Sequence, residues 1–171
     1  AITFQVIQGR GLTAWNQIKL IQTYHLIPHP EGGYFKETIT SEQVIDLHNR
    51  LTRPLYTSIL FLLHNHDVSH FHSLQSDEIW IFQQGDPLDI VCIKDDGSLD
   101  IIHLGLEAHC VPQALVKAGV IFGSYVPSHS YSLVACIVSP GFIYEEFVLY
   151  KKEELLNLYP HHETYIQLLG L

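Results

Sequence analysis

Residues 68–88 read VSHFHSLQSDEIWIFQQGDPL, and this stretch decides the fold. Two runs within it, 68–74 and 78–82, are predicted to be β-strands bounded by turn residues. The Gly-Asp-Pro turn at 85–87 ends the second strand. The second strand follows the first after only a short turn, so an antiparallel pairing is expected to bring their side chains together.

The same organisation continues on both sides of this stretch. Further strands are predicted at 33–39, 55–63, 88–94, 99–104, 114–116, 120–125, 131–138 and 142–149, with a hairpin turn at Asp95, Asp96 and Gly97. About nine or ten short strands at spacings near eight to twelve residues are typical of an antiparallel sandwich or β-barrel.

Helices are predicted near both ends of the chain. Thr13 can cap an amphipathic helix that runs to about Tyr24, and the Pro-His-Pro run that follows cannot continue it. Residues 1–12 are predicted as a short strand or an ordered arm, residues 151–158 as a closing helix, and residues 163–171 as a further turn or a tail. No repeat or linker divides the chain, so residues 1–171 are predicted to form a single domain.

The composition excludes several classes of function. Apolar types make up 47% of the 171 residues, and nine basic against eighteen acidic residues give a formal charge of −9. A chain this acidic lacks the basic face that nucleic acid or an anionic membrane attracts, so neither partner is expected. No apolar run approaches the ~18 residues of a spanning helix. Three cysteines without a C-x-x-C spacing indicate a reducing compartment, so a soluble cytoplasmic protein is expected.

Two histidines and a carboxylate form the first candidate site. His70 and His72 are two apart in a predicted strand, so their side chains are expected on one face, with Glu78 of the next strand beside them. These three groups suit Fe(II), Mn(II), Ni(II) or Zn(II) and are candidate metal ligands. The pattern equally fits a polar patch that holds water or an organic ligand and no metal. His64 and His66 are expected to face solvent in a turn.

The segment PHPEGGYFKET, residues 28–38, is the second candidate site. Glu31 precedes two glycines, which allow a close backbone approach or a positive φ. In the strand that follows, Phe35 and Glu37 are expected on one face and Tyr34 on the other. Glu31 and Glu37 are candidates for ligand contact, and Tyr34 is a candidate hydroxyl donor. A glycine turn and an ordinary edge strand explain the same residues.

Several motifs resemble a known family. His70-x-His72, Glu78 and Gly85 resemble the first motif of the cupins, although the spacing from His72 to Glu78 is slightly longer than usual. More specifically, the chain resembles the cupin-5 family over about residues 15–160. The segments that carry this resemblance are, in order, PHPEGGYFKET, SILFLL, FHSLQSDEIWIFQQGDPL, PQALVKAGV and LVACIVSPGF. The resemblance implies an all-β double-stranded β-helix, the cupin jelly roll, which is usually a homodimer with a pocket in the barrel.

The resemblance also implies which residues belong to the site. The family's motif positions fall on Glu31, Gly32, Gly33, Tyr34, Phe35, Glu37, Ser69, His72, Asp77, Glu78, Trp80, Gly85, Asp86, Gln113 and Gly119. Ile81 and Ser73 depart from the pattern, because many relatives have histidine and arginine there. The segment KAGVIFGSYV contains no histidine, where metal-binding cupins supply one. The usual cupin metal site is therefore not expected, unless the loop of His129 folds inward.

The ligand-binding residues expected from this set are Glu31, Gly33, Phe35, Glu37, Ser69, Trp80 and Gln113. Cys136 lies in an apolar run and is expected in the core rather than as a nucleophile.

A weaker similarity adds a reaction class. Residues 33–37 are similar to the G-x-F-x-E segment of the dTDP-sugar 3,5-epimerases, which have the jelly-roll fold and need no metal. This similarity implies His72 as the base, Glu78 or Asp77 as its orienting carboxylate, and Tyr34 or Tyr131 as the acid. Those enzymes also hold phosphate groups with arginine, and this chain has only Arg10, Arg50 and Arg53.

Three functions therefore stay open. The first is metal-independent proton transfer on a carbohydrate or nucleotide sugar, with His72, Glu78 and Tyr34 as catalytic residues. The second is a metal-dependent cupin enzyme that uses His70, His72 and Glu78. The third is a non-catalytic module that binds a small molecule.

Overall fold

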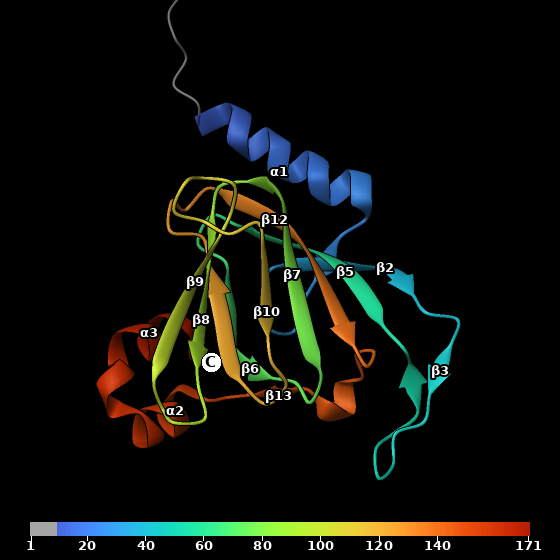
Figure 1. Ribbon diagram of the computed structural model, residues 1–171. Helices are drawn as coiled ribbons and strands as arrows, with labels where there is room; N and C mark the ends of the chain where they lie inside the picture. Colours follow the sequence, from blue (N-terminus) through green and yellow to red (C-terminus); the bar gives the residue numbers. More distant parts are fainter. Residues whose placement is uncertain (1–9) are drawn as a thin grey trace, which may run out of the picture.

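The fold consists of two antiparallel β-sheets that face each other, with helices on their outer sides (Figure 1). The structure, a computed structural model, describes residues 10–171. The six-stranded sheet has the order β1 (Ile27–Pro28), β2 (Tyr34–Thr40), β5 (Thr57–His64), β12 (Tyr131–Ser139), β7 (Asp77–Gly85) and β10 (Gln113–Val116). The five-stranded sheet has the order β13 (Val148–Leu149), β6 (Val68–Ser73), β11 (Ile121–Tyr125), β8 (Leu88–Ile93) and β9 (Leu99–Leu104).

The main core lies between the two sheets. Apolar side chains alternate inward from both sheets, and Phe61, Trp80 and Phe122 are the largest of them. The strand β8 is buried on both faces: Ile90 packs into this core, while Val91 packs outward. Burial on both faces explains why the sequence of β8 is apolar almost throughout.

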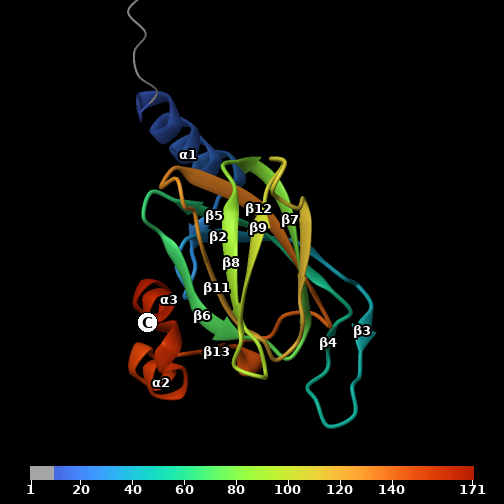
Figure 2. The same cartoon turned by 60° about the vertical axis from the view of Figure 1, so that its left-hand side comes forward.

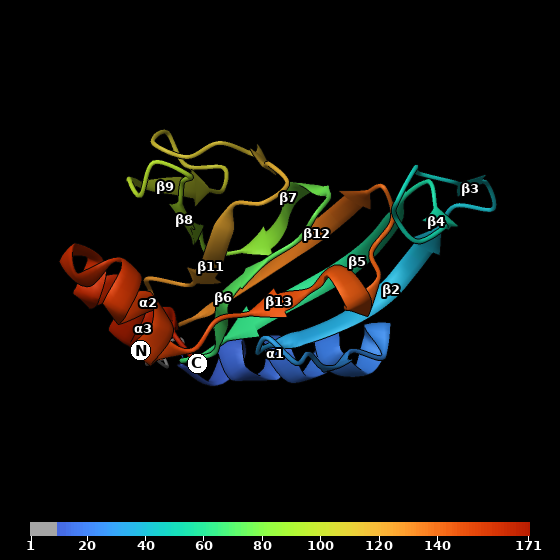
Figure 3. The same ribbon diagram turned by 90° about the horizontal axis from the view of Figure 1, so that it is seen from below.

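Helices cover the outer sides of the sheets. The helices α2 (Lys152–Leu158) and α3 (Glu163–Leu169), joined by the short 3-10 helix η2 (Pro160–His162), pack on the outside of the five-stranded sheet (Figure 2). The helix α1 (Arg10–Tyr24) lies along the outer side of the six-stranded sheet (Figure 3), where Leu20 packs against Leu62 and Leu133. Within residues 10–171 no helix combines the length and the apolar character that a bilayer crossing requires.

The small sheet of β3 (Val44–Ile45) and β4 (Arg53–Pro54) projects from the end of the six-stranded sheet (Figure 1). The other irregular segment joins β12 to β13 and contains the 3-10 helix η1 (Tyr144–Glu146). Both segments lie on the side of the sandwich where the cavity described below opens.

The predicted double-stranded β-helix with terminal helices is confirmed, whereas three details of the prediction are wrong. The two sheets stay separate among the described residues, so the fold is an open sandwich rather than a closed barrel. The predicted strand at 142–149 is the η1 turn, and only Val148–Leu149 pairs with a neighbour. The segment 163–171, predicted as a further turn or a tail, contains the helix α3. The strand or arm predicted at 1–12 falls on residues 1–9, which lie outside the described residues, and on the start of α1.

Candidate functional site

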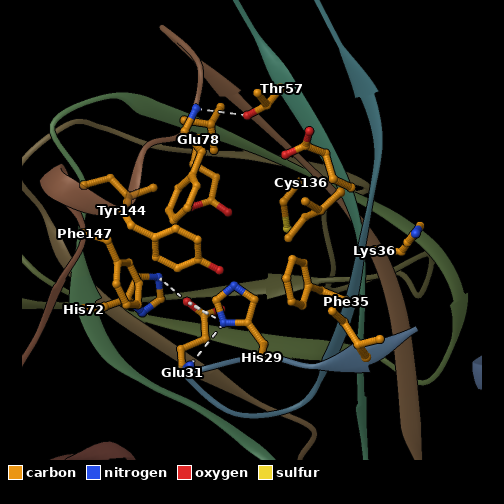
Figure 4. Close-up of a pocket in the computed structure, with 16 residues that line it drawn as sticks. His29, Glu31, Phe35, Lys36, Thr57, His72, Glu78, Cys136, Tyr144 and Phe147 are labelled. Carbon is orange, nitrogen blue, oxygen red and sulfur yellow. Dashed lines mark hydrogen bonds and ion pairs between the residues drawn. The ribbon is translucent and has the colours of Figure 1, made fainter. Parts of the chain in front are cut away.

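A cavity of about 400 Å³ opens between the inner face of the six-stranded sheet, the strand β6 and the segment after β12 (Figure 4). Histidine and glutamate side chains lie on its floor, and aromatic and aliphatic side chains form its walls. Its lining consists of Ile27, His29, Glu31, Phe35, Lys36, Glu37, Thr57, Ile59, His72, Leu74, Glu78, Cys136, Val138, Phe142, Tyr144 and Phe147.

A β-bulge in β6 decides which histidine reaches this cavity. Phe122 pairs with His72 and Ser124 pairs with Ser69, so two residues of β6 lie opposite the single residue Gly123. A Cβ atom on Gly123 would lie 2.7 Å from the Ser69 carbonyl oxygen, so glycine permits this close approach. The bulge reverses the alternation of side chains along β6. Ser69 and His72 therefore share the inward face, although they are three residues apart.

The prediction that His70 and His72 share one face is wrong for this reason. The Nδ1 atom of His70 donates a hydrogen bond to the carbonyl oxygen of Leu169 in α3, at 3.2 Å, and His70 does not line the cavity. Among residues 10–171 no three His, Cys, Asp or Glu side chains form a group that could hold a metal ion. The residues present thus do not fit the predicted metal site of His70, His72 and Glu78.

His72 is paired with Glu31 instead of Glu78. Its Nδ1 atom donates a hydrogen bond to the carbonyl oxygen of His70 at 2.7 Å, and its Nε2 atom lies 3.1 Å from Oε2 of Glu31. Because Nδ1 already carries a proton, the short contact at Nε2 requires a second proton between the ring and the carboxylate. The pair therefore shares one proton. Both side chains are buried, and burial raises the pKa of Glu31 and lowers the pKa of His72 to about 4.

The loop before β2 holds Glu31 in place. Gly32 has a φ of +109°, and a Cβ atom there would lie 2.0 Å from the carbonyl oxygen of Val68, so only glycine fits. The carbonyl of Glu31 accepts the backbone N–H of His70 at 2.7 Å. Its Oε1 atom accepts the Ser69 hydroxyl at 3.0 Å. The turn thus places the carboxylate beside β6, in the cavity floor.

His29 belongs to the site, and the sequence reasoning did not single it out. Its Nδ1 atom accepts the backbone N–H of Glu31 at 3.1 Å, so a neutral ring carries its proton on Nε2. Burial is the main cause that lowers the pKa of His29 and favours this neutral form. The ring packs against Phe35, with ring centres 4.5 Å apart, and its free edge points into the cavity (Figure 4). Its place between two prolines, two residues before Glu31, is the signal that could have identified it.

Glu78 presents an unused carboxyl oxygen. The side chain is 6% exposed, and its Oε2 atom is buried without a hydrogen-bond partner. Burial is the largest cause that raises its pKa to about 8, the nearby Glu31 adds to the shift, and a hydrogen bond with Cys136 opposes it. The carboxyl is therefore largely protonated at neutral pH and can donate a hydrogen bond to a ligand. Cys136 lies at the cavity and is also packed in the core.

The segment after β12 forms one wall and the mouth. Phe142 and Phe147 are part of the lining, and the Tyr144 hydroxyl points into the cavity although its side chain is partly in solvent (Figure 4). The Oγ1 atom of Thr57 accepts the backbone N–H of Phe142 at 3.0 Å. Phe35 is part of the lining, and Glu37 lies at the rim, where Oε1 accepts the Thr40 hydroxyl.

Other predicted site residues lie elsewhere. Tyr34 faces outward beneath α1, with its ring 5.4 Å from that of His64. Trp80 is in the core between Phe61 and Phe122, with Nε1 unpartnered. Three other predicted ligand-binding residues do not line the cavity. Gln113 is exposed on β10, and Gly33 packs its backbone against β5. Ser69 is buried behind Glu31. Tyr131, the alternative acid, and Asp77, the alternative orienting carboxylate, do not line the cavity. Tyr131 packs beneath α1, and Asp77 accepts the Ala118 N–H.

We predict that Glu78 makes the stability of the protein depend on pH. Its pKa is about 8 in the folded chain and 4.5 for an ordinary glutamate. Between these values the folded chain binds the extra proton, so stability falls as the pH rises, by up to about 1.4 kcal/mol per pH unit. Glu78→Gln removes this loss. Urea unfolding of the wild type and of Glu78→Gln should be measured at several pH values. As the pH rises to about 8, the free energy of unfolding of the variant should increase relative to that of the wild type.

Comparing the wild type with Glu78→Gln also separates the pH effect of Glu78 from that of His72. The lowered pKa of His72 has the opposite sign, so it makes stability rise between about pH 4 and 6.5 in both proteins. Parallel stability curves above pH 6.5 would contradict the raised pKa of Glu78.

Comparisons with known proteins agree with this fold. Residues 18–150 match the family Cupin_5, described as Cupin superfamily (DUF985). An uncharacterised protein of Saccharomyces cerevisiae is 30% identical over 156 residues, which cover 81% of this chain and 77% of that protein. A protein of Shewanella oneidensis has a structure with a TM-score of 0.84 and 41% identity, covering 90% of this chain and 96% of that chain.

A hypothetical protein from Leishmania major has a TM-score of 0.82 and 36% identity, covering 88% of this chain and 96% of that chain. Oxalate decarboxylase from Bacillus subtilis is a distant match, with a TM-score of 0.56 and 13% identity over 88% of this chain and 38% of that chain. At that identity the likeness concerns the fold alone.

Proposed function

The chain belongs to the Cupin_5 family of the cupin superfamily, and on this basis we propose that its cavity binds a small polar molecule and transfers protons on it. Isomerisation or epimerisation next to a carbonyl group is the reaction class that the side chains support best. The observation that carries the proposal is the proton-sharing pair of Glu31 and His72 in the same buried cavity as the unpartnered carboxyl oxygen of Glu78.

The pair of Glu31 and His72 is the proton acceptor. Ser69 and the His70 carbonyl orient its two members, so the pair is held in position before a substrate binds. A proton taken from a substrate carbon goes to a carboxyl oxygen of Glu31, while the proton shared with His72 moves fully to Nε2 of the ring. The pair then carries one positive charge. That charge is stabilised by the negative charge that develops at the same time on the substrate oxygen.

Glu78 and His29 are the donors to that oxygen. The raised pKa of Glu78 keeps its carboxyl protonated, and the neutral His29 ring carries its proton on the edge that points into the cavity. In the step itself, the carbon–hydrogen bond breaks, its proton goes to the pair, and its electrons move to the carbonyl oxygen. Return of a proton to the other face, or to the neighbouring carbon, gives the epimer or the isomer, and no oxidant is consumed.

The proposal is tested by isotope exchange. Candidate keto-sugars are incubated with the protein in deuterated water, and proton NMR follows the loss of the signal next to the carbonyl. Exchange is expected with the wild type and should vanish in His72→Ala. His64→Ala should exchange normally, because His64 lies outside the cavity lining, at the end of β5 and partly buried rather than in the solvent-facing turn expected from the sequence. If sugars shift the melting temperature but none exchanges, the protein is a binding module and not an enzyme.

We also propose that the protein is a homodimer. Ile39, Ile137, Ile79 and Leu115 form a row across the outer face of the six-stranded sheet, with Ser58 between the first two. Ile79 is 40% and Leu115 is 48% exposed, whereas helices α2 and α3 cover the other sheet. An uncharged apolar row of this kind suits a second copy of the chain related by a two-fold axis, because both copies then present the same surface.

A charged side chain introduced into this row should dissociate the dimer. In light-scattering measurements after size exclusion, the wild type is expected as a dimer and Ile79→Lys as a monomer. Leu106→Lys is the matched control, because Leu106 is 74% exposed in a loop away from this row and should leave the dimer intact. A dimeric Ile79→Lys variant would show that the two copies associate through another surface.

A further inference from the structure

We propose, as a refinement that rests on the proposed function, that the ligand of the cavity is an uncharged ring compound with hydroxyl or carbonyl groups, and not a phosphate ester or a nucleotide sugar. A free sugar or a sugar lactone belongs to this class. The inference depends on which charged groups reach the cavity, which are already paired elsewhere, and which are buried in its floor.

The two arginines between β3 and the end of β4 are paired within the protein. Arg53 and Arg50 both contact the carboxylate of Glu146, with Arg53 Nη2 at 2.7 Å from Oε1 and Arg50 Nη2 at 2.6 Å from Oε2. A second bond joins Arg53 Nη1 to Oε2, so that pairing is bidentate. Arg53 also donates to the Leu51 carbonyl and has a fully buried side chain. Neither arginine lines the cavity, so neither is available to a phosphate group.

Carboxyl groups outnumber ammonium groups in the cavity lining. Glu31 and Glu78 are buried in its floor and Glu37 lies at the rim, whereas Lys36, an exposed rim residue, is the lining's one ammonium group among the described residues. A phosphate dianion bound here would lose its hydration and meet carboxyl groups in place of guanidinium groups. An uncharged ligand avoids this cost and can use the same carboxyl groups as hydrogen-bond partners.

The rest of the lining suits one ring of modest size. The lining includes the apolar side chains of Phe35, Ile59, Val138, Phe142 and Phe147 beside the polar groups of the floor and of Tyr144. Ligand sites generally combine apolar walls with a few polar groups that fix orientation, in volumes of about 300–1,000 Å³. The cavity of about 400 Å³ is at the lower end of this range and suits a single polar ring.

The experiment compares matched pairs by isothermal titration calorimetry with the wild-type protein. The pairs are fructose and fructose 6-phosphate, mannose and mannose 6-phosphate, and glucose and dTDP-glucose. At least one free sugar is expected to bind, and its phosphorylated partner to bind more weakly by about tenfold or more, which is at least 1.4 kcal/mol. Equal or tighter binding of a phosphorylated partner overturns the inference, as does the failure of every free sugar to bind.

A pair of tyrosine variants places the binding in this cavity. Tyr144→Ala removes an exposed mouth residue and should weaken the free sugar about tenfold, whereas Tyr56→Ala removes a similarly exposed tyrosine outside the lining and should not. Equal affinity in both variants would show that the sugar binds elsewhere and would overturn the inference.

The outcome is distinguishable from failure of the proposed function. A phosphate ester that binds and exchanges its proton refutes the inference alone. A free sugar that binds selectively without exchange refutes proton transfer alone.

Discussion

Replacing Glu146 by alanine is expected to lower the free energy of unfolding by about 3–5 kcal/mol, the usual cost of removing one partner from a buried ion pair. Glu146 accepts hydrogen bonds from Arg50 and from the fully buried Arg53, and these contacts lower its pKa to about 2. Without the carboxylate, Arg53 keeps its charge in a place that water does not reach. Urea unfolding at neutral pH measures the loss.

The same turn provides the control. Glu145 precedes Glu146 in η1 and is exposed, so Glu145→Ala should change stability by less than about 0.5 kcal/mol. The double variant Arg53→Met with Glu146→Ala should recover part of the loss, because the unpaired charge is then gone. A single Glu146→Ala variant as stable as Glu145→Ala would contradict the buried pair.

Acid should also lower the stability of the wild type, because it protonates Glu146. The pKa of Glu146 is lowered from 4.5 to about 2, so its contribution is complete above pH 4.5 and is lost as the pH falls through about 2. Glu146→Ala lacks this contribution at every pH, so its stability relative to the wild type should improve as the pH falls through that window.

Replacing Glu31 by glutamine is expected to reduce proton exchange on a substrate by about 10²–10⁴-fold, the usual contribution of a positioned acid–base group. Glutamine has the same shape and can still accept the Ser69 hydroxyl. It cannot take up a proton, and its amide cannot share one with Nε2 of His72 as the carboxyl does. The exchange assay in deuterated water measures the rate, with substrate affinity measured separately.

Two further measurements distinguish a chemical role of Glu31 from a structural one. Substrate affinity and melting temperature should change far less than the exchange rate, because the side-chain volume is kept. Glu42→Gln, an exposed change in the loop after β2, should leave the rate unchanged. If Glu31→Gln exchanges protons at the wild-type rate, the pair is not the proton acceptor.

Part of the site could be read from the sequence because local rules govern it. The two glycines after Glu31 predicted a tight backbone approach, and Gly32 makes one against β6. The alternation in the following strand predicted Phe35 and Tyr34 on opposite faces, and only the structure shows that the face of Phe35 is the cavity side. The assignment of Tyr34 as the acid nevertheless stays unsupported, because its side of the strand faces α1.

The prediction for β6 was wrong because a bulge interrupts a local rule. Strict alternation puts His70 and His72 on one face, and the extra residue opposite Gly123 separates them. A glycine in the middle of an apolar strand is a known sign of a bulge or a close backbone approach, so Gly123 was a usable signal. The wall formed by Phe142, Tyr144 and Phe147 carried no such signal, since that segment resembled a strand.

The chain's own pattern of apolar residues, turns and glycines predicted an antiparallel sandwich or barrel and the short motifs that carry His72, Glu31 and Glu78, and the family resemblance added the jelly roll. These features depend on neighbours within a few residues, which the sequence displays directly. Only the tertiary structure decided that His72 pairs with Glu31 rather than Glu78, that Arg50 and Arg53 are occupied by Glu146, and that His29 lies in the cavity. Each of these depends on contacts between distant segments or on burial, and both arise only when the sheets pack together.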